Sequence, residues 1–230
     1  MNGFSLSGWI VMLSRWVARL ALTNVSWFFL NIPTWFAIYS WYVSDHKFAM
    51  IHYVLFIVVF TFVYFPTTRA MFMSLRHWML EQDEKNKQTH YFRTLFRHYK
   101  SFLKTNVLFT VIWMIWFVDF YILIDVSQFI AVVMIVIGVL LFAFQMIFFC
   151  MEAHMDMTMK DLMKYAALTT VGSPVLTVFI LFVTGALSYI ALFQFTALLP
   201  FFSGVGIAYL ALLMFNHWTE SVKNKAEKRK

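Results

Sequence analysis

Six hydrophobic stretches, each long enough to cross a bilayer as a helix, occupy most of this 230-residue chain. About 20 apolar residues in a helix span the hydrocarbon core of a membrane. Backbone groups in lipid must be satisfied within each segment, so helices are the expected spanning structure. The sequence predicts an all-α polytopic membrane protein, a six-transmembrane helix bundle forming a single integral membrane domain over residues 1–230. The stretches are Leu20–Val43, Ala49–Phe65, Leu103–Ile124, Phe129–Met151, Val175–Phe193 and Pro200–Phe215.

The basic residues are strongly biased to one set of connecting segments. Of the 18 Lys and Arg residues, every one except Lys47 lies in the N-terminal segment, the second loop, the fourth loop or the C-terminal tail. Positive charge near the ends of spans is retained in the cytoplasm. We therefore expect a multi-pass membrane protein with both termini in the cytoplasm. The net charge of +7 is explained by this orientation, and no nucleic-acid partner is expected.

Three polar or amphipathic segments connect and flank these spans. Residues 1–19 carry apolar side chains at helical spacing and predict an amphipathic interfacial helix. Residues 66–104 predict a cytoplasmic helical hairpin of short amphipathic helices, with Pro66 opening the first helix and Glu81–Thr89 as the exposed turn. Residues 216–230 form a basic cytoplasmic tail, and Glu152–Gly172 reads as a short loop.

The basic residues of the hairpin are candidate contacts for a partner protein or for membrane lipid. On the second amphipathic helix they form a stripe opposite an apolar face. Such a stripe is typical of an anchor attracted to anionic lipid, at about 1 kcal/mol per basic residue, and it equally suits docking of a protein. Both interpretations stay open. The candidates are Arg69, Arg76, Arg93, Arg97, Lys100 and Lys104.

Polar side chains inside the predicted spans have two interpretations. Asn31 and Pro33 lie in the first span, where they indicate either an interhelical hydrogen bond with a packing kink or part of a substrate path. In the last span, Gly204 and Ala208 form a small-xxx-small pair that favours close helix approach. The candidates for a polar path are Asn24, Asn31, Asn106 and Gln145, with Thr184 and Ser188 beside them.

Motifs of common membrane enzymes and pumps do not occur in the sequence. There is no GxxxxGK[ST], HExxH or GxSxG, and no span carries an acidic residue near its centre. Glu152, His154 and Asp156 lie two positions apart, so they do not share a helix face and make a poor metal site. The single Cys150 excludes an intramolecular disulfide. We expect no enzymatic activity, no catalytic residues, no cofactor and no metal.

Three segments in order resemble the YesL family of small bacterial membrane proteins, a domain of unknown function. They are Asn24-Val-Ser-Trp27, then Phe65-Pro-Thr-Thr-Arg-Ala-Met-Phe72, then Tyr91 to Asn106 with its Lys-Thr-Asn end. Tyr165 to Pro174 is similar to the entry of that family's fifth span. One departure is Phe65, where the family commonly has Gly. The resemblance implies a Gram-positive plasma membrane and an association with carbohydrate uptake, because such proteins are typically encoded beside sugar ABC importers; it carries no catalytic residues.

Two functions of different class follow. The first is a non-enzymatic accessory or assembly subunit of a carbohydrate ABC importer, which binds permease subunits in the membrane. This hypothesis rests on the resemblance. The alternative is an independent small-solute transporter or channel, which needs a polar path through the bundle. An intramembrane enzyme is the least supported function.

Overall fold

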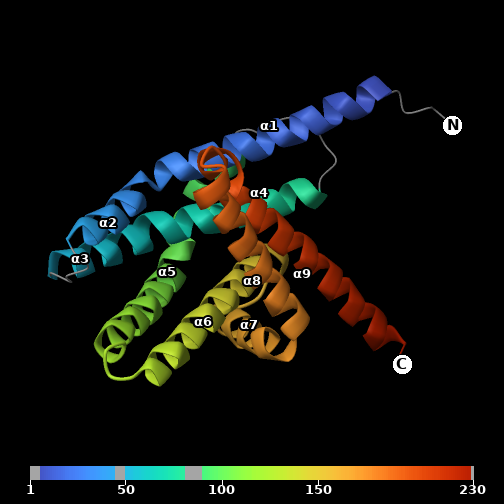
Figure 1. Ribbon diagram of the computed structural model, residues 1–230. Coiled ribbons are helices and arrows are strands. Elements are labelled where there is room, and N and C mark those ends of the chain that lie inside the picture. Colours follow the sequence, from blue (N-terminus) through green and yellow to red (C-terminus); the bar gives the residue numbers. More distant parts are fainter. Residues whose placement is uncertain (1–5, 45–49, 81–89, 229–230) are drawn as a thin grey trace.

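The computed structural model describes residues 6–44, 50–80 and 90–228, and all regular structure in these ranges is helical (Figure 1). The predicted turn Glu81–Thr89 lies outside the described residues. In these ranges three short π-helical turns occur: η1 joins α3 to α4, η2 ends the helix that begins as α8, and η3 begins the helix that continues as α9. The elements are α1 (Leu6–Leu30), α2 (Ile32–Val43), α3 (Met50–Val59), η1 (Phe60–Tyr64), α4 (Phe65–Leu80), α5 (His90–Leu123), α6 (Gln128–His154), α7 (Met159–Gly172), α8 (Pro174–Tyr189), η2 (Ile190–Gln194), η3 (Leu199–Ser203) and α9 (Gly204–Glu227).

Five helical segments in the described ranges are long and apolar enough to cross a membrane. They correspond to the second through sixth predicted spans and confirm an all-helical membrane protein at that level. The first predicted span, Leu20–Val43, is not among them, because the helix breaks at Asn31 and continues as α2. Pro33 lies in the first turn of α2, where a backbone N–H would have no acceptor within the helix, so a proline is favourable there. The segments are Met50–Leu80, His90–Leu123, Gln128–His154, Pro174–Gln194 and Leu199–Lys225.

Several boundaries differ from those that the sequence predicted. The amphipathic segment 1–19 is not a separate element, since α1 runs without a break from Leu6 to Leu30. The tail at 216–230 continues α9 as helix to Glu227. The predicted loop Glu152–Gly172 contains α7, whose start is capped by Thr158: its hydroxyl accepts from the Asp161 N–H at 3.3 Å and donates to the Asp161 carboxylate at 2.7 Å. Helical propensity and capping extend these helices beyond the apolar runs.

The first half of the chain forms an antiparallel pair of long, interrupted helices. In Figure 1, α1 and α2 lie along the top, and α3, η1 and α4 return beside them. Asn31 fastens the pair at the break, because its side-chain amide donates to the Trp27 carbonyl at 2.8 Å and to the Thr67 hydroxyl at 2.9 Å. The Trp27 indole N–H donates to the Thr68 hydroxyl at 3.1 Å. The interhelical hydrogen bond expected of Asn31 is therefore present.

Pro66 does not separate two helices, although the sequence placed a helix start there. The chain is helical throughout Met50–Leu80, and the π turn η1 lies immediately before the proline. Pro66 has no backbone N–H, so one carbonyl in the preceding turn lacks its usual hydrogen-bond donor. Side chains from α5 supply the donors instead: the Tyr99 hydroxyl bonds the Phe62 carbonyl at 2.9 Å, and the Asn106 amide bonds the Thr61 carbonyl at 3.3 Å.

Helix α4 is the centre of the molecule. It contacts α1, α5, α6, α9 and η1, and most of its residues are buried all around the helix. The sequence predicted an amphipathic helix lying along the inner leaflet or against another helix; α4 packs against several helices and, enclosed by neighbours, has no exposed stripe. Phe65, Met71, Phe72 and Leu75 are at most 2% exposed and join the main apolar core.

The second half adds two hairpins to this centre. Helices α5 and α6 form one and α8 and α9 the other, with α7 packed against α6 (Figure 1). At the start of α9, a Cβ on Gly204 would lie 2.8 Å from Cζ3 of Trp27, so the glycine permits α9 to approach α1. Ala208 is fully buried. The close approach expected of the small-residue pair is thus made against the indole of Trp27.

Candidate functional site

The most buried charged residue is Arg69 of α4, whose side chain is 2% exposed. An arginine in an apolar interior requires a counter-charge and a partner for nearly every N–H, because burying an unpaired charge costs several kcal/mol. The neighbours of Arg69 on α5 and α6 meet that requirement.

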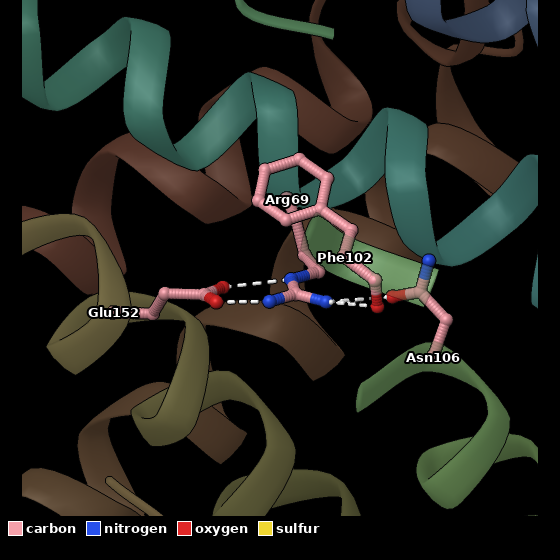
Figure 2. Close-up of polar contacts among 4 residues, drawn as sticks. All are labelled: Arg69, Phe102, Asn106 and Glu152. Atoms are coloured by element: carbon pink, nitrogen blue, oxygen red, sulfur yellow. Dashed lines mark hydrogen bonds and ion pairs between the residues drawn. The ribbon is translucent and has the colours of Figure 1, made fainter. Parts of the chain in front are cut away.

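Three helices contribute to the Arg69 cluster, defined as Arg69, Phe102, Asn106 and Glu152 (Figure 2). Glu152 accepts two hydrogen bonds from the guanidinium, at 2.7 Å from Nε to Oε2 and through a second pair between Nη2 and Oε1. Nη1 donates to the Phe102 carbonyl at 2.9 Å and to Oδ1 of Asn106 at 2.8 Å. The Phe102 ring lies 4.2 Å from Cζ of Arg69. A bidentate carboxylate and a cation–π contact thus fix α4, α5 and α6 to one another.

A polar cavity of about 610 Å³ opens beside this cluster, and we call it the arginine–histidine cavity. Glu152 belongs to both: its carboxylate holds Arg69, and the residue also lines the cavity. Three arginines and four histidines contribute to the wall. The lining residues are Met73, Arg76, His77, His90, Arg93, Thr94, Arg97, His98, Glu152, Ala153, His154, Met155 and Asp156.

The aromatic rings of the cavity are ordered by stacking and local hydrogen bonds. The His77 and His90 rings stack with centroids 4.0 Å apart and an interplanar angle of 8°. His90 Nδ1 lies 3.2 Å from the Thr94 hydroxyl. Nδ1 of His154 lies 3.1 Å from the Cys150 carbonyl, which requires a proton on Nδ1. The His77–His90 stack joins the end of α4 to the start of α5. A hydrogen bond from Nη2 of Arg76 to the His154 carbonyl, at 3.3 Å, adds the end of α6.

Three of the six predicted basic contacts meet in this cavity. Arg76 comes from α4, and Arg93 and Arg97 come from one face of α5. Lys100 and Lys104 are exposed further along α5 and do not line the cavity. Arg69 needs correction as a partner- or lipid-binding residue, because it is buried and bound to Glu152. The six basic candidates therefore divide into the buried Arg69, three arginines that line the cavity, and two exposed lysines outside it.

The four residues proposed for a polar path are buried, but the structure does not bring them together into one channel. Asn24 joins α1 to η3 and α9, donating to the Leu199 carbonyl at 2.9 Å and accepting from the Val205 N–H at 2.8 Å. Asn31 fastens the α1–α4 pair, and Asn106 belongs to the Arg69 cluster. Each amide binds a neighbouring helix.

Gln145 has a different environment from the three asparagines. Its side-chain oxygen accepts from the Trp113 indole, and it lies at an apolar cavity of about 340 Å³. Aromatic side chains from α2, α3, η1 and α5 make most of the wall, including Trp41, Phe56 and Trp113. Thr184 and Ser188, named with the path, lie on α8 and do not line this cavity.

Sequence reasoning missed Glu152 and the histidines as members of one site. Glu152 was considered only with His154 and Asp156, as a metal site, whereas its partner Arg69 lies 83 positions earlier. The sequence did contain a pattern that could have predicted this pair. Glu152 comes at the end of a long apolar run, and Arg69 is the basic residue closest to the apolar run of its own helix. A charge so placed needs a partner within the membrane region.

Comparisons with known proteins identify part of the chain. No curated protein and no solved structure matches it. Residues 20–121 match the family described as a protein of unknown function, DUF624. That segment includes α4, Arg69, Asn106 and the cavity residues of α4 and α5. The resemblance drawn from the sequence is therefore confirmed over residues 20–121, which match DUF624, the domain found in YesL-type membrane proteins.

Proposed function

We propose that the protein is a non-enzymatic accessory or assembly subunit of a carbohydrate ABC importer in a bacterial plasma membrane. The observation that supports this proposal is the use of the interior polar groups. Asn24, Asn31 and Asn106 all hold helices together, and Gln145 is bound by an indole. A bundle whose buried amides are occupied in this way suits a rigid binding partner better than a solute path. The link to carbohydrate import rests on the resemblance to the YesL family.

In this proposal the chain crosses the membrane six times, with both termini in the cytoplasm. The α1–α2 pair makes the first crossing despite its break, because α1 and α2 together run antiparallel to the α3–α4 segment. The basic hairpin, α7 and the end of α9 then lie on the cytoplasmic side, in agreement with the positions of all Lys and Arg residues but Lys47.

The permease would bind to the outward face of α5. In α5, only 17% of the most apolar 18-residue stretch is buried within the molecule. This is the smallest share among the five described helices that are long and apolar enough to span a membrane. Val107, Val111 and Ile115 recur every four residues along this face and are 46–57% exposed. In a membrane, helices associate through close packing of such faces, because lipid provides no hydrophobic drive between them.

Co-purification in mild detergent from the native membrane tests this assignment. We expect permease subunits to be recovered with the wild-type chain, and to be lost when Val111→Trp and Ile115→Trp are combined, because bulky rings prevent close packing. The matched control places Val175→Trp and Val178→Trp on the exposed face of α8, whose side chains are 71% and 62% exposed. Equal recovery from all three proteins would contradict a permease contact at α5.

Flux measurements separate the accessory function from the alternative transporter. The purified chain alone in liposomes is expected to give no oligosaccharide or small-solute flux above empty liposomes under an ion gradient. In cells, its deletion is expected to impair uptake of one class of sugar only when the permease is present. Sustained flux by the chain alone would overturn the accessory proposal and support the transporter.

A further inference from the structure

The arginine–histidine cavity concentrates positive charge that carboxylates of the described residues do not balance. Three guanidinium groups line it, from Arg76, Arg93 and Arg97. Of the two acidic residues in the wall, Glu152 is committed to Arg69, which leaves the exposed Asp156. Arg93 and Arg97 are one helical turn apart, where like charges repel by a few tenths of a kcal/mol. Within the described ranges, neither of them makes an ion pair with a carboxylate.

One polar atom in the same wall lacks a hydrogen-bond partner among the described residues. Nε of Arg76 is inaccessible to solvent and has no partner in the described part of the chain. The only hydrogen bond of the Arg76 guanidinium there is a long one, at 3.3 Å from Nη2 to the His154 carbonyl. A buried polar atom without a partner destabilises a fold by about 1–3 kcal/mol. A guanidinium N–H left without an acceptor beside a polar cavity is suited to a ligand that supplies oxygen acceptors.

We propose that the arginine–histidine cavity binds a phosphate-bearing anion. A phosphate group presents several oxygens at fixed angles, and the planar guanidinium fork matches them two at a time. Arg76 on α4 and the pair on α5 approach from different helices, so one tetrahedral group can be bound from two sides. This function goes beyond binding of a permease and does not depend on it.

A metal ion is a poorer occupant of the same cavity. Although four histidines line it, no group of three or more His, Cys, Asp or Glu residues is placed to hold a metal among the described residues. Guanidinium groups also repel a cation and cannot ligate one. The histidines instead add hydrogen-bond donors, and additional positive charge when they are protonated.

The phosphate group has two physical sources. The cavity lies at the ends of spanning helices, where the headgroup of an anionic phospholipid is within reach, and it is also open enough for a free phosphate or a phosphorylated metabolite. The recognition chemistry is the same in both, so one set of variants tests both sources with two probes.

Thermal unfolding of the purified chain, followed by tryptophan fluorescence, measures this binding. One probe is inorganic phosphate, titrated against chloride at constant ionic strength in a neutral detergent. The other is a nanodisc containing phosphatidylglycerol, compared with one of phosphatidylcholine alone. A ligand specific for the folded state raises Tm as its concentration rises above Kd. We expect at least one probe to stabilise the wild-type protein.

The matched variants decide whether the cavity is responsible. Arg93→Gln combined with Arg97→Gln removes two exposed guanidiniums without disturbing the core, and we expect it to weaken the apparent affinity by about tenfold or more. Lys100→Gln combined with Lys104→Gln removes the same charge from the same helix outside the cavity, and should leave the affinity within about twofold.

Each outcome is decisive. Stabilisation by phosphate that only the arginine variant loses identifies a soluble ligand, and the same pattern with phosphatidylglycerol alone identifies a lipid. No stabilisation by either probe overturns the proposal. Equal losses in the arginine and lysine variants also overturn it, because they would show a general charge effect rather than a site.

Discussion

Arg69 shows how one charged residue can organise an apolar interior. Four of its hydrogen bonds reach Glu152, the Phe102 carbonyl and Asn106, on two neighbouring helices. Such an arrangement costs a large desolvation free energy, and it is stable only while every partner is present. The residue therefore contributes specificity of packing: α4 fits between α5 and α6 in one register.

Substitutions at Arg69 and Glu152 should not be additive. Glu152→Leu leaves a buried guanidinium without a counter-charge, and we expect it to lower the free energy of unfolding by about 3–5 kcal/mol, less some relief because Glu152 is 15% exposed. Combining it with Arg69→Met removes both charges and should recover a large part of the loss. Thermal unfolding in detergent checks this, and a double variant less stable than Glu152→Leu would contradict it.

At the scale of the element, the helix Met50–Leu80 keeps its direction through a proline because another helix satisfies the carbonyls that the proline cannot. The Tyr99 hydroxyl and the Asn106 amide reach the Phe62 and Thr61 carbonyls. The segment Phe60–Phe65 thus depends on α5 for its hydrogen bonding, so the two helices are expected to form as one unit.

A double-mutant cycle tests this dependence. Tyr99→Phe alone should destabilise the protein by about 1 kcal/mol, because the Phe62 carbonyl loses its donor. In a Pro66→Ala background a backbone N–H is available in the preceding turn, and the same change should cost less than about half as much. Equal costs in both backgrounds, measured by chemical or thermal unfolding, would show that Tyr99 does not substitute for the missing N–H.

The contact between α1 and α9 provides a second test at this scale. Gly204→Ala places a methyl group 2.8 Å from the ring of Trp27, which is itself held by Thr68. We expect a loss of about 1–3 kcal/mol from overpacking. Gly185→Ala is the control, since nothing lies within 4 Å of its Cβ position. Similar Tm values for the two variants would contradict the close approach.

The sequence predicts a helix well where the length of an apolar run determines it. It predicts a helix less well where side chains far along the chain determine its course. The helices at the predicted spans after the first follow from hydrophobicity alone, and the structure has a long apolar helix at each of them. The continuous passage through Pro66 depends on Tyr99 and Asn106, more than 30 positions away, and no local pattern contains that pairing. Likewise, the sequence indicates that Arg76, Arg93 and Arg97 are candidate binding residues. It does not show that α4 and the end of α6 complete a cavity around them.

At the scale of the whole molecule, the charge distribution sets the orientation that we propose. In a variant with Cys150→Ala, single cysteines at Val126 and Asn224 should lie on opposite sides of the membrane. We expect Val126→Cys, in the connection between α5 and α6, to react with an impermeant maleimide in intact cells. Asn224→Cys, near the end of α9, should react only after permeabilisation. The reverse pattern would invert the topology.

Asn24 also imposes an order on biosynthesis. Its two hydrogen-bond partners, at Leu199 and Val205, lie 175 and 181 positions later in the chain, so they leave the ribosome long after α1. At about 5–20 residues per second, α1 waits roughly 10–35 s for them. During that interval the amide of Asn24 must be solvated by lipid headgroups, water or an insertase. Asn24→Leu should therefore ease early insertion of α1, as a pulling-force assay on nascent chains would show. The finished protein should unfold at a lower temperature, because α1 loses its hydrogen bonds to η3 and α9.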